Sequence, residues 1–188
     1  MGIVKRAVAL IATLDTKGAE AEYMRRRLEG RGLGVVLIDV SMRGEPKGSK
    51  PDIASREVAG AASATMEEVR SMHRHGAVEA MAAGLRRVCS ELYESGRIVG
   101  AVGMGGADGA IVASSGMRAL PFGTAKVLIT PAMGLAESLA DTRDLVLFHS
   151  VADVAGLNAI TRRVLDNAAG AIAGMIEGGR VPWIGLGI

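Results

Sequence analysis

Short apolar runs alternate along the chain with longer segments of helical spacing. Five of these runs are nearly continuous and contain β-branched residues: residues 4–13, 33–40, 98–102, 125–130 and 145–149. A continuous apolar run of this length is typical of a strand that is buried on both faces. The sequence therefore predicts five strands, of which the first two are expected to be buried on both faces.

Amphipathic segments fill the intervals between the predicted strands. Helical spacing of the apolar residues occurs in residues 19–30, 53–62, 65–72, 77–95, 110–120 and 158–176. Thr65 with Glu68 has the signature of a capping box, and Asn158 is expected to cap the last helix. Residues 41–55 are rich in Gly, Pro, Ser and Lys, which predicts a long loop.

Strands that alternate with helices require right-handed crossovers, and these produce a parallel sheet. We therefore predict an α/β fold with an open, mainly parallel five-stranded sheet and helices on both faces, a Rossmann- or flavodoxin-like three-layer sandwich. Residues 1–179 are expected to form this one domain. Ligands bind such sheets beyond the carboxyl ends of the strands, so the loops that follow the strands are the candidates for function.

Composition narrows the classes of function. The 188 residues are 49% hydrophobic and 3% aromatic, with a formal net charge of +2. Because the chain has no basic block and few rings to stack on bases, we expect no nucleic-acid partner. We also expect no membrane partner, because no apolar run is long enough to span a bilayer. The single cysteine, Cys89, excludes an intrachain disulfide and lies in a helical pattern, so we expect a buried thiol in a cytoplasmic protein.

A glycine-rich loop follows the third predicted strand. Residues 103–109 read Gly-Met-Gly-Gly-Ala-Asp-Gly and precede a helix. Peptide N–H groups in such a loop, together with a helix N-terminus, attract anions. The candidate ligand contacts are Gly103, Gly105, Gly106, Asp108 and Gly109. The spacing is not the dinucleotide fingerprint and has no Walker-type lysine, so a tight strand-to-helix turn is the alternative.

Polar residues also follow the other strands. After the first strand, the hydroxyls of Thr13 and Thr16 and the ammonium of Lys17 suit a phosphate or carboxylate, and Asp15 suits Mg²⁺. N-capping of the next helix is the alternative role for Asp15 or Thr16. The remaining candidates at this edge are Thr130 after the fourth strand, and Ser150 and Asp153 after the fifth. His149 and Ser150 are adjacent and lie in no nucleophile-elbow motif, which argues against a hydrolytic triad.

Several strings, in this order, resemble the Tm-1-like ATP-binding domain family. They are residues 11–18 (Ile-Ala-Thr-Leu-Asp-Thr-Lys-Gly), residues 117–121 with Gly123 and Lys126, residues 150–158 and residues 167–175. The resemblance implies ATP with Mg²⁺, bound by the residues that match the family pattern: Thr13, Asp15, Thr16, Lys17, Gly103, Gly105, Gly106, Gly109, Ser150 and Asp153. Apart from the resemblance, the carboxylates of Asp15 and Asp108 are the candidate ligands for Mg²⁺. The resemblance also implies a second α/β domain, and residues 180–188 resemble the first strand of that domain. The loop departs from the family pattern where Ala107 and Asp108 replace hydroxyl and glycine positions.

Three functions remain open. The first is a nucleotide-binding module that acts with a second domain or subunit, in a homo-oligomer. The second is an enzyme acting on a sugar acid or polyol, with Asp108, Asp153 or Lys17 as acid/base groups. The third is a non-catalytic interaction protein, in which the small residues of the last helix form a dimer contact.

Overall fold

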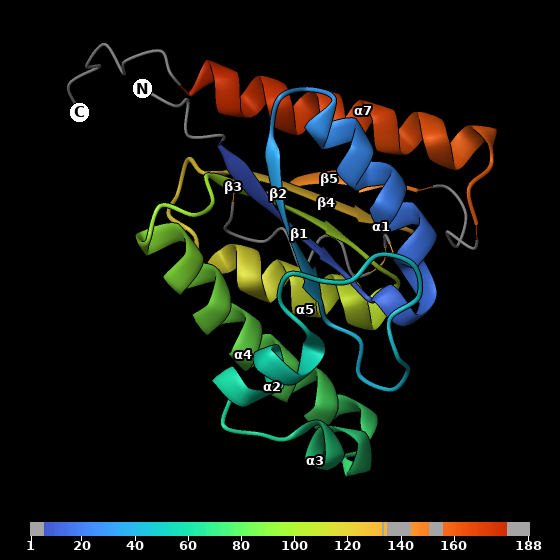
Figure 1. The fold of residues 1–188 in the computed structure, drawn as a ribbon, viewed down its shortest axis with the longest axis vertical. Coiled ribbons are helices and arrows are strands. Elements are labelled where there is room, and N and C mark those ends of the chain that lie inside the picture. The colour runs from blue at the N-terminus through green and yellow to red at the C-terminus, as the bar shows by residue number, and fades with distance from the viewer. Residues whose placement is uncertain (1–5, 133, 135–143, 151–155, 180–188) are drawn as a thin grey trace.

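A five-stranded parallel sheet runs through the centre of the protein (Figure 1). The computed structural model describes residues 6–132, 134, 144–150 and 156–179. The strands are β1 (Ala7–Ala12), β2 (Gly34–Asp39), β3 (Gly100–Met104), β4 (Ala125–Thr130) and β5 (Val146–His149). Their order in the sheet is β2-β1-β3-β4-β5, and every neighbouring pair is parallel. The predicted fold class is confirmed.

Helices cover both faces of the sheet (Figure 1). On one face lie α1 (Leu14–Glu29) and α7 (Ala159–Gly178). On the other lie α4 (Arg74–Glu94) and α5 (Ala107–Arg118), and the shorter α2 (Ser55–Ala61) and α3 (Met66–Ser71) pack against α4. None of the helices formed by described residues is both long enough and apolar enough to cross a membrane.

Strand β1 explains why the strands are apolar without interruption. Val8 and Leu10 lie in the core beneath α1 and α7, whereas Ala9 and Ile11 lie in the core on the opposite face. All four side chains are fully buried. Because successive side chains of a strand point to opposite faces, a sheet covered on both sides favours apolar residues at nearly every position. The buried polar residues of the strands, such as Lys126 in β4, have hydrogen-bond partners.

Three helices begin earlier than the sequence suggests. Helix α1 begins at Leu14 rather than at residue 19, α4 at Arg74 rather than at residue 77, and α5 at Ala107 rather than at residue 110. The first amides of α1 are satisfied from another strand: Leu14 N–H donates to Asp39 Oδ1 at 3.1 Å, and Asp15 N–H donates to Ser41 Oγ at 3.0 Å. These partners let the helix begin directly after β1.

The long loop after β2 crosses over the start of α1. A Cβ placed on Gly18 would lie 1.7 Å from the carbonyl oxygen of Lys47, so only glycine permits this crossing. Lys47 N–H then donates to Leu14 O at 3.0 Å. The crossing holds the early part of the loop, with Met42 and Arg43, beside the carboxyl edge of the sheet.

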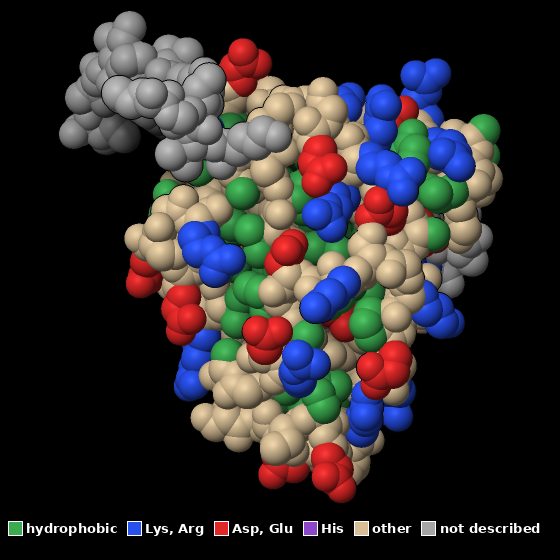
Figure 2. All heavy atoms as spheres, viewed as in Figure 1, with side chains coloured by type: hydrophobic (Ala, Val, Ile, Leu, Met, Phe, Trp, Pro, Cys, Tyr) green, Lys and Arg blue, Asp and Glu red, His purple; other side chains and the backbone are tan. Residues whose placement is uncertain are grey.

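Cys89 is fully buried in α4, as predicted. Burial raises the pKa of its thiol to about 12, so the thiol stays protonated at neutral pH. On the face of the molecule seen in Figure 2, acidic and basic side chains are interspersed rather than gathered by sign.

Candidate functional site

The sheet topology brings the ends of β1 and β3 together. The chain leaves β1 toward β2 on one side, and β3 lies on the other side of β1. The last residues of the two strands, Ala12 and Met104, are register partners. Connections that diverge from neighbouring parallel strands leave a crevice at the carboxyl edge, which is where open α/β sheets bind ligands.

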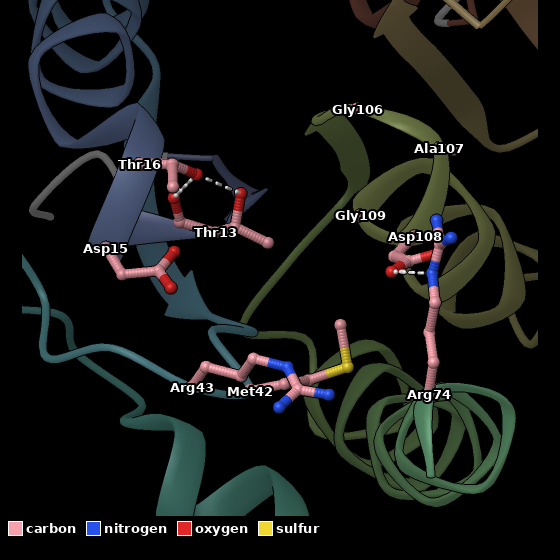
Figure 3. A pocket seen from close by; sticks show the side chains of 10 residues that line it. All are labelled: Thr13, Asp15, Thr16, Met42, Arg43, Arg74, Gly106, Ala107, Asp108 and Gly109. Carbon is pink, nitrogen blue, oxygen red and sulfur yellow. Dashed lines mark hydrogen bonds and ion pairs between the residues drawn. The ribbon is translucent and has the colours of Figure 1, made fainter. Parts of the chain in front are cut away.

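A cavity of about 280 Å³ opens at this point (Figure 3). The start of α1 forms one wall, with Thr13, Asp15 and Thr16. The start of α5 forms the opposite wall, with residues 106–109, and Met42, Arg43 and Arg74 complete the lining. The structure thus brings together two groups of predicted residues that lie about 90 positions apart in the sequence.

Only one of the two helix N-termini at the cavity has open peptide amides. The amides of α1 bond to Asp39 and Ser41, as described above. In α5, the N-cap Gly106 provides no side chain, and Ala110 N–H is the first amide with a helical bond, to Gly106 O at 2.8 Å. Within the described part of the chain, the N–H groups of residues 106–109 have no hydrogen-bond acceptor. These four amides add to the positive end of the α5 dipole and favour an anion.

The charged side chains at the cavity differ in how they are held. Arg74 Nε lies 3.1 and 2.8 Å from the two carboxylate oxygens of Asp108, and Arg74 Nη2 lies 2.9 Å from Oδ1. The hydrogen bonds that Arg74 donates to Asp108 raise the pKa of Arg74. Arg43, by contrast, has no carboxylate at ion-pairing distance among the described residues. Arg43 is therefore the cation available to a ligand.

The hydroxyls and the carboxylate of the α1 wall lie on the opposite side. Thr13 Oγ1 and Thr16 Oγ1 are 3.1 Å apart and hydrogen-bonded to each other. Asp15 Oδ2 accepts the N–H of Gly44 at 3.2 Å, which ties the long loop to this wall. The described residues contain no cluster of three or more His, Cys, Asp or Glu side chains that could hold a metal ion. A Mg²⁺ ion at Asp15 would therefore need ligand oxygens to complete its coordination.

Residues 6–180 match the N-terminal domain of an uncharacterised protein family, UPF0261. The chain belongs to the UPF0261 family. It is 33% identical over 177 residues to a UPF0261 protein of Clostridium tetani, which covers 93% of this chain and 44% of that protein. It is 34% identical over 191 residues to the ToMV resistance protein Tm-1(GCR237) of Solanum lycopersicum, covering 91% of this chain and 25% of that protein. These matches confirm the resemblance to Tm-1-like proteins, and the chain spans less than half the length of either relative.

Two glycines of the glycine-rich residues 103–109 lie behind the cavity rather than in its lining. A Cβ on Gly103 would lie 2.7 Å from Ala113 Cβ and 2.9 Å from Met117 Cε, so this glycine lets α5 pack on β3. A Cβ on Gly105 would lie 2.9 Å from Gly109 Cα, where the loop folds against the helix. Gly103, a residue of β3, thus serves packing and Gly105 shapes the turn, while Gly106 and Gly109 line the cavity.

Other predicted residues lie near the same edge but outside the cavity lining. Lys17 is buried at a kink in α1 (φ −122°, ψ 21°) and lines a small apolar hollow with Glu20. Thr130 is fully buried, and its Oγ1 accepts the N–H of Ala132 at 3.1 Å. Ser150 is also buried, and its N–H donates to Thr130 O at 3.3 Å. Asp153 and residues 180–188 lie outside the described residues.

Three lining residues escaped the sequence analysis: Met42, Arg43 and Arg74. The position of the long loop after β2 was a usable signal for the first two, because a loop after a strand reaches the ligand edge. No such signal exists for Arg74, which begins a helix that is not preceded by a strand of the sheet.

A groove of about 590 Å³ lies at the amino edge of the sheet, bordered by Arg6, Val99 and Thr124. These residues precede β1, β3 and β4 respectively. The groove is larger than the cavity, but none of the described residues that border it belongs to the N-terminus of a helix. The helices that connect the parallel strands begin at the opposite edge of the sheet. We therefore place the candidate site at the smaller cavity.

Proposed function

We propose that this UPF0261 domain binds the phosphate end of a nucleotide in the cavity between β1 and β3, and that ATP with Mg²⁺ is the first ligand to test. The observation that carries the proposal is the row of open amides at residues 106–109, together with Arg43, which lines the same cavity and makes no ion pair with any described residue. Oriented amides and a guanidinium group are the groups that recognise phosphate oxygens, and Arg43 is an exposed residue whose side chain can turn toward the ligand.

The size of the cavity supports a ligand that is only partly enclosed. At about 280 Å³ it is at the lower end of the range for small-molecule sites, so it suits a phosphate group better than a whole nucleotide. We propose that the rest of the nucleotide reaches toward a second domain or subunit. The greater length of the relatives is consistent with such a partner. A homo-oligomer in the cytoplasm would provide the subunit and keep Cys89 reduced.

The test is calorimetric titration of the 188-residue protein with ATP, ADP and inorganic phosphate, each with and without Mg²⁺. We expect binding of at least one of them, and Arg43→Ala should weaken it by about tenfold or more, as expected when a charge-assisted hydrogen bond is lost. Arg26→Ala is the matched control, because Arg26 is an exposed, ion-paired residue of α1 outside the cavity. Absence of any heat of binding with all three ligands refutes the proposal.

A second function rests on the α1 wall. A carboxylate and two hydroxyls, from Asp15, Thr13 and Thr16, suit the hydroxyl groups of a sugar acid or polyol. The amides of residues 106–109 would then hold the carboxylate of the sugar acid. Titration with a series of sugar acids separates the two functions, because a nucleotide site requires the phosphate and a sugar-acid site does not.

A further inference from the structure

Asp108 poses a problem for any anion in this cavity. It is the second residue of α5, inside the row of open amides, and its side chain is partly exposed. A carboxylate there competes with the ligand for the same positive potential and repels it. The site can accept an anion only if the charge of Asp108 is offset.

Arg74 is placed to offset that charge. It reaches from the first turn of α4 across to α5 and grips both carboxylate oxygens of Asp108 (Figure 3). This position gives α4 no benefit, because a cation at a helix N-terminus opposes the helix dipole. Helix α4 is capped independently, since His73 Nδ1 accepts the N–H of Gly76 at 3.0 Å.

The residues around the ion pair leave Arg74 as the main cation beside Asp108. Asp108 and Arg74 also line a small hollow with Met42, Arg43 and Val69. Within the described residues, Arg43 makes no ion pair with Asp108, although it lies in the same hollow. Arg74 therefore holds Asp108, and Arg43 remains for the ligand.

We infer that Arg74 acts through Asp108: it is the counter-ion that makes the cavity accept an anion, and Asp108 is thereby the residue that sets the ligand charge the site tolerates. This inference rests on the proposed function. It differs from a direct role, in which the Arg74 guanidinium itself contacts the ligand. The two roles make opposite predictions when both charges are removed.

The experiment is a double-mutant cycle with inorganic phosphate and ATP as probes. Arg74→Ala should weaken binding by about tenfold to a hundredfold, because it leaves a negative charge beside the ligand. Asp108→Asn alone should leave binding unchanged or make it tighter. Arg74→Ala combined with Asp108→Asn should restore binding to within about threefold of Asp108→Asn, since no repelling charge is left.

Thermal unfolding of every variant, with Arg26→Ala as the matched surface control, checks that the fold is retained. Arg74→Gln, which keeps the side-chain stem, replaces Arg74→Ala if that variant is less stable. A double variant that binds as weakly as Arg74→Ala overturns the inference while the proposed function stands. A wild-type protein that binds neither probe overturns both, so the two failures are distinguishable.

Discussion

Gly103 and Gly106 belong to the same glycine-rich sequence, but Gly103 lies in β3 and Gly106 caps α5, and substitution by alanine should separate their roles. A Cβ on Gly103 would lie 2.7 Å from Ala113 Cβ, 2.9 Å from Met117 Cε and 3.0 Å from Leu128 Cδ1. Carbon atoms in a packed core are normally about 3.5–4.0 Å apart. The added methyl group must therefore displace three buried side chains by several tenths of an ångström each.

Overpacking of this kind costs about 1–3 kcal/mol. The lower entropy of the unfolded chain with alanine offsets about 0.4–1 kcal/mol of that cost. We therefore expect Gly103→Ala to lower the free energy of unfolding by about 1–2 kcal/mol, and each kcal/mol should lower Tm by about 2–4 °C for a chain of this size. Gly106 has φ −66° and no atom within 4 Å of its added Cβ, so Gly106→Ala should change stability by less than about 0.5 kcal/mol.

In ligand binding the order should be reversed: Gly106→Ala should lose more affinity than Gly103→Ala. Gly106 lines the cavity, so its added methyl group takes space beside the open amides, and we expect weaker phosphate binding. Urea denaturation followed by circular dichroism measures the stability, and calorimetric titration measures the binding. Equal stability of the two variants, or a larger loss in Gly106→Ala, would refute the assignment of Gly103 to packing and of Gly106 to the site.

Two further predictions concern buried groups away from the cavity. Partial burial raises the pKa of Asp144, but hydrogen bonds donated by Lys126 Nζ and Gly123 N–H outweigh this and lower it overall. The contribution of Asp144 to stability is therefore fully present above its pKa in the unfolded chain, and it is lost as the pH falls through its pKa in the folded protein. Asp144→Ala should destabilise the protein by about 3 kcal/mol at pH 7, because Lys126 is left buried without its carboxylate, and the difference from wild type should shrink in denaturation curves below pH 4. Because burial raises the pKa of the Cys89 thiol to about 12, a thiol-specific chromogenic reagent at pH 8 should not react with the folded protein. The same reagent should react fully in denaturant. Rapid reaction of the native protein would contradict the burial of Cys89.

The strands and the local caps could be read from the sequence because their causes are local. All five strands were predicted from their apolar runs. The runs of β1, β3 and β4 reflect burial on both faces, whereas β5 is a partly exposed edge strand. Thr65 Oγ1 accepts the N–H of Glu68 at 3.2 Å, and Asn158 Oδ1 accepts the N–H groups of Ile160 and Thr161 at 2.9 Å. Each of these bonds joins residues two or three positions apart, so the motif contains both partners.

The start of α1 could not be read in this way. Its first amides are satisfied by Asp39 and Ser41, 25 or more residues along the chain. Only the pairing of β2 with β1 brings these acceptors to the helix. Thr13, Asp15 and Thr16 therefore read as a turn in the sequence but belong to a capped helix in the fold.

The sequence by itself determined the layered architecture and the candidate edge for a ligand, because parallel strands joined by right-handed crossover helices follow from the alternation of strands and helices. The order of the strands, which makes β1 and β3 neighbours, came only from the tertiary structure. Only the tertiary structure decided which glycines face the cavity, since Gly103 and Gly106 differ in what packs against them and not in their chemistry. It also decided the charges of the site: Arg74 and Asp108 are 34 residues apart and meet only because α4 packs against α5. Contacts between distant segments arise from packing of the whole core, and no local pattern of residues records them.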